Sequence, residues 1–265
     1  MIEQISKQKI FDVIKSIDSK IVQKIIIFDE VTSTNNEAKK LIQNGEEEGT
    51  IILALTQKTG RGRFQRIWES PKGGLYFSII LKPTVSPEKT TLLPLVGALA
   101  VSSTLRSYGL SAEIKWPNDV RVRKKKIAGI LLESDAYKSH LHYVILGIGV
   151  NLNIDINVLS DEIKNKTTSL FQEHHAVDYV KFLKELLLQL DTYYLLFLNE
   201  EYETIISEWK KQSDTMNRRV KIVSSTDEII GAAYNVDNSG FLLVITDSGE
   251  YKKIMSGDCL YFDEL

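Results

Sequence analysis

The sequence predicts an α+β fold: a central mixed or antiparallel sheet covered by helices, followed by a small C-terminal β-barrel. Three observations lead to this prediction. β-rich runs and helical patterns alternate between residues 10 and 150, which is typical of a sheet covered by helices. A long helical zone rich in Leu, Tyr and Glu then spans 178–211. Short β-like runs follow it, separated by turns of Asp, Asn, Ser and Gly.

The elements of the larger part follow from their periodicity. Isoleucines recur at three- and four-residue steps from Ile10 to Ile21, which predicts an amphipathic first helix. A second helix is expected to begin within 32–37, where a hydroxyl or an Asn can cap it. A third helix is expected over 92–108. The strands of the sheet are expected at 24–28, 50–56, 75–81, 112–116, 127–134 and 143–150.

The sequence pattern changes in the last part of the chain, from a long helical zone to short β-like runs. A boundary is expected near 213–217, which divides the chain into 1–214 and 215–265. The short strands of the second part are expected at 219–223, 229–236, 241–246, 251–254 and 259–262.

Composition removes several classes of protein. The formal net charge of −2 disfavours a protein that coats nucleic acid through its overall charge. Cys259 is the only cysteine, which excludes an internal disulfide framework and a CxxC zinc site, and we interpret it as a core thiol. The sequence shows no signal peptide and no apolar run of about 18 residues, so we expect a cytoplasmic protein without a membrane span.

Positive charge is concentrated in two segments. Residues 58–74 hold five cations, one acid and four glycines, and 121–126 hold five cations in six residues. Glycines let backbone N–H groups approach an anion, and arginines offer forked donors to phosphate or carboxylate. We interpret 58–74 as a loop that closes over a phosphate-bearing small molecule, with a solvated basic surface as the alternative. Trp68 either stacks on a planar base there or is buried in the core.

Two further segments carry chemistry. Lys115-Trp116-Pro117-Asn118-Asp119 ends a strand and turns, and turning alone would account for its Asn-Asp pair. Lys126 stands directly before an apolar strand, so its ammonium is expected at the mouth of that strand unless it is an ordinary surface lysine. Gly129, and the glycines of 147–151, leave room for a ligand or another backbone.

Taken in order, these segments resemble the biotin–protein ligases. The matching residues are Ser33-Thr34-Asn35, Gln57, Gly60-Arg61-Gly62-Arg63, Trp68-Glu69-Ser70-Pro71, Lys115 to Asp119, Lys126 to Leu131 and Gly147 to Asn151. The match covers about 24–153, and the terminal barrel resembles the SH3-like domain of that family. One departure is Gln65, where the loops of the family often have a glycine.

The resemblance implies a fold and a reaction. It implies a class II synthetase-like catalytic domain over 1–214, an SH3-like domain over 215–265 and a short form without an N-terminal DNA-binding domain. The implied substrates are ATP, with Mg²⁺ on its phosphates, and biotin, which together form biotinyl-5′-AMP. The activated carboxyl then acylates a lysine of a biotin carboxyl carrier domain.

The resemblance also assigns roles to individual residues. Lys126 and Arg63 are the expected catalytic residues. The expected biotin-binding residues are Ser33, Thr34, Asn35, Gln57, Arg61, Gly62, Arg63, Lys126 and Gly129. The expected ATP- and adenylate-binding residues are Arg61, Arg63, Arg66, Trp68, Asn118, Lys126 and Asn151.

Three other functions stay open at this point. A lipoate ligase shares the fold and the chemistry, but the sequence lacks the arginine-rich, triple-glycine pattern associated with that family. A biotin-responsive repressor needs a winged helix, for which only 23 residues precede the first expected strand. A basic-loop nucleic-acid binder would bind with a steep salt dependence. We expect no DNA and no membrane as partners, and a homodimer is left open.

Overall fold

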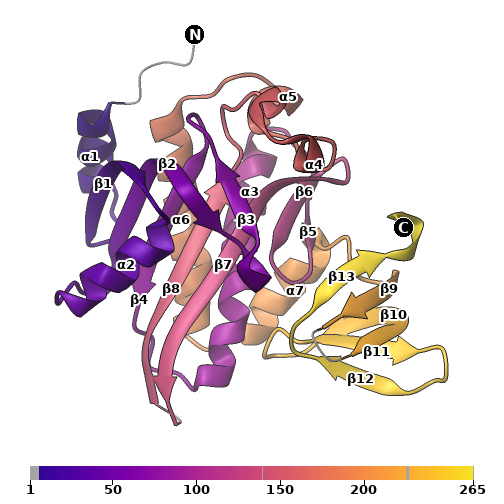
Figure 1. Ribbon diagram of the computed structural model, residues 1–265. Coiled ribbons are helices and arrows are strands. Elements are labelled where there is room, and N and C mark those ends of the chain that lie inside the picture. The colour runs from indigo at the N-terminus through magenta and orange to yellow at the C-terminus, as the bar shows by residue number, and fades with distance from the viewer. Residues whose placement is uncertain (1–5, 139, 225–226, 265) are drawn as a thin grey trace.

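The larger part of the protein is built on a mixed eight-stranded sheet (Figure 1). The structure is a computed structural model that describes residues 6–138, 140–224 and 227–264. The strands follow the order β1-β2-β4-β8-β7-β6-β5, with β3 paired to β2. β1 and β2 are parallel, and the other neighbours are antiparallel. Their bounds are β1 (Lys24–Val31), β2 (Thr50–Arg61), β3 (Ile67–Ser70), β4 (Leu75–Leu81), β5 (Ala112–Lys115), β6 (Asp119–Val122), β7 (Lys125–Tyr137) and β8 (His140–Val150).

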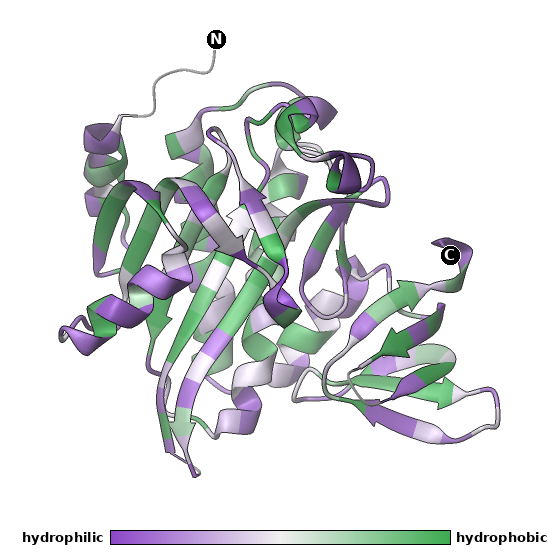
Figure 2. Ribbon diagram, in the orientation of Figure 1, coloured by the Kyte–Doolittle hydropathy of each residue, from purple (hydrophilic) through white to green (hydrophobic). Residues whose placement is uncertain are grey.

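Helices cover both faces of this sheet. Alternate residues of β2 separate the faces: Ile51 and Leu53 belong to the large core beneath α3 and α6, whereas Ile52 packs with Ala38 of α2 on the opposite face. Figure 2 shows α2 as a largely hydrophilic helix that crosses the apolar strands. Within the described ranges, no helix combines the length and the apolar character needed to cross a membrane. The helices are α1 (Lys7–Ser16), α2 (Thr34–Gln43), α3 (Leu93–Ser107), α4 (Asp161–Lys164), α5 (Leu170–Glu173), α6 (Tyr179–Leu198) and α7 (Tyr202–Gln212).

A second sheet of five antiparallel strands follows in the order β12-β11-β10-β9-β13. This agrees with the predicted fold class, and the sheet lies beside β5 and β6 in Figure 1. The domain boundary between 214 and 215 stays a prediction. The strands are β9 (Arg219–Val223), β10 (Glu228–Val236), β11 (Leu242–Thr246), β12 (Tyr251–Ile254) and β13 (Asp258–Tyr261).

The helical predictions were too long in two places. α1 ends one residue before Ile17, which is extended. The turn that follows is held by Asp191 on α6, whose carboxylate accepts the Ser19 hydroxyl (2.7 Å) and the backbone N–H groups of the next two residues. The zone 178–211 is two helices, which meet at Glu200 with a positive φ of 61°. Both breaks depend on contacts or backbone angles that periodicity does not report.

Two strands of the sheet were not predicted. β2 continues to Arg61 and pairs with β3, so that Gly60 lies opposite Trp68. The segment that was interpreted as a loop closing over a ligand is therefore a hairpin, with a short 3₁₀ turn over Arg63–Gln65 at its tip. β6 likewise forms the first half of a hairpin with β7. Each of these strands has only four residues. β3 shows no polar–apolar alternation, and the alternation of β6 is too short to identify a strand beside a turn, so both depend on pairing to a neighbour.

Candidate active site

One cavity brings together the residues that the sequence selected. Its volume is about 380 Å³, within the range of about 300–1,000 Å³ that is typical of small-molecule sites. The start of α2, strands β2, β3, β7 and β8, the turn 116–118 and the start of β13 form its wall. All of the predicted site residues line it: Ser33, Thr34, Asn35, Gln57, Arg61, Gly62, Arg63, Arg66, Trp68, Asn118, Lys126, Gly129 and Asn151.

Polar side chains close the end of the cavity where α2 begins. Ser33, Thr34 and Asn35 are buried there. The Oε1 atom of Gln57 accepts hydrogen bonds from the Thr34 backbone N–H (2.8 Å) and hydroxyl (3.3 Å), and its Nε2 donates to the Ser70 hydroxyl (2.8 Å). Ser33 occupies the N-cap position of α2, but its side chain makes no capping hydrogen bond. The predicted side-chain cap is therefore absent, and the start of this helix, where the helix dipole is positive, lies at the cavity.

The first arginine of the glycine–arginine segment turns back toward the sheet. Arg61 Nη2 lies 3.0 Å from Oε1 of Glu133, and Nη1 donates to the side chain of Asn36 (2.6 Å). Only about a quarter of the Arg61 side chain is exposed. Arg61 thus secures the base of the hairpin to β7 and α2, at the polar end of the cavity.

The other two arginines of the hairpin contact the C-terminal domain. Arg63 Nη2 donates to the carbonyl of Gly257 (3.1 Å), and its Nη1 donates to Asn118 (3.4 Å). Arg66 forms an ion pair with Asp258. Burial lowers the pKa of the Arg63 guanidinium, although Asp258 opposes this effect, and an arginine stays charged in proteins. The hairpin tip therefore bridges the sheet and the small barrel.

Lys126 lies at the mouth of β7, as predicted, and it has a partner. Its Nζ is 2.7 Å from the Asp119 carboxylate and 5.2 Å from the centre of the Trp68 ring. The indole packs where Gly149 and Gly129 lack side chains: a Cβ on Gly149 would lie 2.7 Å from the Trp68 Nε1. That Nε1 is buried, and no hydrogen-bond partner is found for it among the described residues. The two glycines therefore make room for Trp68.

The two asparagines assigned to the adenylate use their amide nitrogens on the backbone. Asn118 Nδ2 donates to the carbonyl of Ile130 (2.6 Å), and Asn151 Nδ2 donates to that of Thr168 (3.0 Å). Asn151 is buried, with 2% of its surface exposed. Both residues hold the shape of the cavity wall. The Asn118 oxygen accepts from Arg63 (3.4 Å), and the Asn151 oxygen is the atom left for a ligand or another donor.

Sequence reasoning missed two groups in the wall. Lys115 and Asp119 line the cavity, and both stood in the quoted turn motif, where they could have been selected as charged residues beside a strand end. Asp258, Cys259 and Leu260 come from β13 of the barrel, and no local signal connects them with the catalytic part. Cys259 is buried as predicted, and burial raises the pKa of its thiol to about 12.

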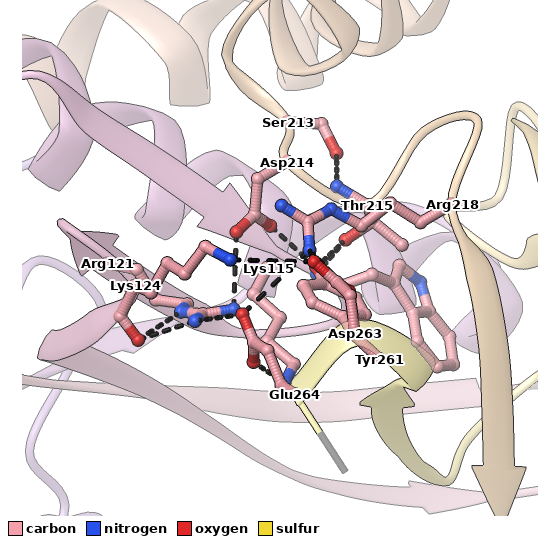
Figure 3. A network of polar contacts seen from close by, with 11 residues as sticks. Lys115, Arg121, Lys124, Ser213, Asp214, Thr215, Arg218, Tyr261, Asp263 and Glu264 are labelled. Atoms are coloured by element: carbon pink, nitrogen blue, oxygen red, sulfur yellow. Dashed lines mark hydrogen bonds and ion pairs between the residues drawn. The ribbon is translucent and has the colours of Figure 1, made fainter. Parts of the chain in front are cut away.

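A polar network joins the barrel to the sheet next to the cavity (Figure 3). Arg121, whose side chain is 6% exposed, pairs with Asp214 (3.3 Å) and with Glu264 (2.6 Å). The Tyr261 hydroxyl donates to Asp214 (2.6 Å). Of the basic run 121–126, only Lys126 lines the cavity, and the Arg121 side chain belongs to this network instead.

The cavity has a surplus of positive charge. Five cations line it, namely Arg61, Arg63, Arg66, Lys115 and Lys126, together with the carboxylates Glu69, Asp119 and Asp258. Among the described residues, no three His, Cys, Asp or Glu side chains are grouped as metal ligands. The arrangement suits an anionic ligand with a buried polar end.

Comparison with known proteins identifies two family segments. The Biotin/lipoate A/B protein ligase family matches residues 26–151, and the Biotin protein ligase C terminal domain matches residues 215–260. A bifunctional ligase/repressor BirA of Bacillus subtilis is 34% identical over 239 residues, which are 89% of this chain and 73% of the relative. A biotin–[acetyl-CoA-carboxylase] ligase of Paracoccus denitrificans is 32% identical and covers 82% of this chain and 92% of the relative.

The fold agrees with these matches. A structure of the biotin protein ligase from Aquifex aeolicus in complex with biotin and ATP superimposes with a TM-score of 0.76 and 29% identity. That comparison covers 90% of this chain and 98% of the other. By both sequence and structure, this chain belongs to the biotin protein ligase family.

Proposed function

We propose that this ligase activates biotin as biotinyl-5′-AMP and transfers it to a specific lysine of a biotin carboxyl carrier domain. The observation that carries the proposal is the convergence of all the predicted residues on one cavity with five cations. Membership of the family and the solved complex of a relative with biotin and ATP support it.

The first step needs charge stabilisation more than a strong base. A carboxylate oxygen of biotin attacks the α-phosphorus of ATP, the bond to the bridging oxygen of the β-phosphate breaks, and pyrophosphate leaves. The nucleophile is already ionised, so the protein has to align the reactants and neutralise phosphate charge. Arg63 and Lys126 are the proposed catalytic residues, because both are cations in the wall of the same cavity. To meet the substrate, Lys126 has to exchange its contact with Asp119.

Biotin is proposed to bind at the polar end of the cavity. Its cyclic urea has two N–H donors and one carbonyl acceptor, which suit a buried group of hydroxyls and amides. The proposed biotin-binding residues are Ser33, Thr34, Asn35, Gln57, Arg61, Gly62, Arg63, Lys126 and Gly129.

The nucleotide is proposed to lie toward the hairpin and the barrel. Trp68 offers an aromatic surface there, and Arg63 and Arg66 carry the charge. The proposed ATP- and adenylate-binding residues are Arg61, Arg63, Arg66, Trp68, Asn118, Lys126 and Asn151.

Mg²⁺ is proposed to accompany ATP. Mg²⁺ is usually held by substrate phosphates with one or two carboxylates, and it does not need a dedicated protein cage. Asp119 and Asp258 in the wall fit that pattern as candidate ligands. The ion would neutralise phosphate charge alongside the cations of the cavity.

The second step forms an amide. The acceptor lysine, as a free amine, attacks the carbonyl carbon of the mixed anhydride, AMP leaves, and the amine nitrogen loses a proton. The acceptor domain is the partner that this step requires.

One experiment tests the whole proposal. The protein is incubated with ATP, Mg²⁺, biotin and an isolated carrier domain, and the carrier is analysed by mass spectrometry for an amide-linked biotin. Reactions without ATP, or with a carrier whose acceptor lysine is replaced by Arg, are the controls. A parallel reaction with lipoate separates the two activities that the matched family includes. Modification by lipoate and not by biotin would overturn the proposal.

A further inference from the structure

Glu133, on β7, lies outside the cavity wall but contacts two residues that form it. Its carboxylate accepts hydrogen bonds from Asn35 Nδ2 (2.8 Å) and from Lys39 Nζ (2.7 Å), and it lies 3.0 Å from Arg61 Nη2. Asn35 and Arg61 line the cavity, and Lys39 lies one helical turn further along α2. With 16% of its side chain exposed, Glu133 is a largely buried acceptor shared by α2 and β2.

The charge of Glu133 is set by these partners. Burial acts to raise the pKa of the carboxyl, but the hydrogen bonds from Lys39 and Asn35 and the charge of Arg61 outweigh it, so that the pKa lies below its usual value. The carboxylate is therefore ionised at neutral pH and can only accept hydrogen bonds. As a result, Asn35 has to direct its amide nitrogen toward Glu133.

The other side of the Asn35 amide is held as well. The Ser78 hydroxyl donates to Asn35 Oδ1 (2.6 Å), and a Cβ on Gly147 would collide with the same oxygen. The Ser78 oxygen also lies 2.8 Å from the Thr34 hydroxyl oxygen. A chain of contacts therefore runs from Glu133 through Asn35 to Thr34, and it fixes which atoms at the polar end can donate and which can accept.

We propose that Glu133 is a positioning residue for biotin: it orients Asn35 and retains Arg61 at the polar end without touching the ligand. The inference rests on the proposed function, because biotin is the ligand assigned to this end of the cavity. It predicts that loss of the carboxylate weakens biotin binding more than ATP binding, because Arg61 is the only one of its partners that is also assigned to the nucleotide.

The principal variant is Glu133→Gln, which keeps the shape and removes the charge. Its amide nitrogen cannot accept a hydrogen bond, so one of the three donors loses its acceptor. A charge-assisted hydrogen bond is worth a factor of roughly 10 to 150, so we expect the KM for biotin to rise about 10-fold or more. The KM for ATP should rise less than the KM for biotin. The kcat of adenylate formation should stay close to wild type, because the lost contacts hold the substrate equally in the ground state and the transition state.

Glu46→Gln is the matched control. Glu46 has a similar side-chain exposure of 18%, and Lys24 Nζ lies 2.9 Å from both of its carboxylate oxygens. Neither Glu46 nor Lys24 lines the cavity. This variant removes a comparable ion pair and should keep the wild-type KM for biotin. A rise equal to that of Glu133→Gln would overturn the inference, because any lost ion pair would then suffice.

A double-mutant cycle tests the route through Asn35. The effect of Glu133→Gln on biotin affinity is measured by titration calorimetry. It should be much smaller when Asn35 is already replaced by Ala, because Glu133 acts on biotin through Asn35. Fully additive effects would contradict the inference. Glu133→Asp keeps the charge and is one methylene shorter, so it serves if Glu133→Gln does not fold. Its shorter side chain withdraws the carboxylate from Asn35, so the KM for biotin should rise. A wild-type KM for biotin in either variant would also overturn the inference. Wild-type protein that fails to bind biotin would instead overturn the proposed function.

Discussion

The Lys126 ammonium lies 2.7 Å from the carboxylate of Asp119 on the neighbouring strand, and both residues line the cavity. The two side chains are 34% and 27% exposed, so the pair lies at the edge between wall and solvent. Without a ligand, Asp119 is the anion that retains Lys126 at the mouth of β7. A substrate carboxylate or phosphate can replace Asp119 at small cost, because a partly exposed ion pair contributes only about 1 kcal/mol or less.

Lys126→Ala should remove most adenylate formation. A single preorganised donor to developing charge is commonly worth about 100- to 1,000-fold in kcat, and a neutral methyl group cannot replace it. Pyrophosphate exchange dependent on biotin measures the step directly. Lys125→Ala, next in the chain and outside the cavity wall, is the control and should exchange at the wild-type rate. Wild-type exchange in Lys126→Ala would contradict the assignment.

Arg63→Ala should loosen the bound adenylate about 10- to 150-fold, the range expected for one charged hydrogen bond. In the structure this guanidinium donates to Gly257 of the barrel, so its loss also weakens the contact between hairpin and barrel. Dissociation of isolated biotinyl-5′-AMP, followed by stopped flow, gives the rate. Arg219→Ala removes an exposed arginine of the barrel that pairs with Asp247, and it should leave that rate unchanged. Equal rates in wild type and Arg63→Ala would count against the role.

Much of the fold could be predicted from the sequence, because the signals were local. Short apolar runs identified strands such as β4 and β8, and turn residues separated the five strands of the barrel. The site residues were found from short motifs, and they meet because the strands that carry them, including β2, β7 and β8, are neighbours or near neighbours in one sheet. Which strand lies beside which was not contained in any motif.

The remaining features depend on contacts between distant parts of the chain. Arg121 was counted with the basic run, but Asp214 and Glu264 bury it between sheet and barrel. Gly149 was interpreted as room for a ligand or another backbone, and the side chain of Trp68 takes that room once β3 pairs with β2. Asp258 reaches the cavity only because the barrel docks against the hairpin. Patterns in a single sequence give only the spacing of residues along the chain. They could not predict these contacts, because the residues in contact lie far apart in the sequence.

Gln65 should be a site where glycine stabilises the protein and valine destabilises it. Its φ is +60°, in the left-handed region that glycine adopts freely and that a β-branched residue strongly disfavours. We expect Gln65→Val to lower the free energy of unfolding by about 1–2 kcal/mol, and Gln65→Gly to change it by less than about 1 kcal/mol, in the stabilising direction. Urea unfolding of the wild type and both variants measures their free energies of unfolding and so ranks their stabilities. Val equal to or more stable than Gln would show that the turn is not held in this conformation.

Arg121→Met should destabilise the protein by about 3–5 kcal/mol, because it leaves the buried carboxylate of Asp214 without its cation. Among the described residues, Glu264 keeps only the more distant Lys115 and Arg218, at 3.9 Å each. Arg123→Met is the matched control two residues away: its side chain is 81% exposed, and its ion pair with Glu173 is worth about 1 kcal/mol or less. Urea unfolding compares the two. The loss in Arg121→Met should be smaller in a variant that also carries Asp214→Asn, since the charge left unpaired is then reduced. Equal stability of Arg121→Met and Arg123→Met would mean that the network does not hold the barrel against the sheet.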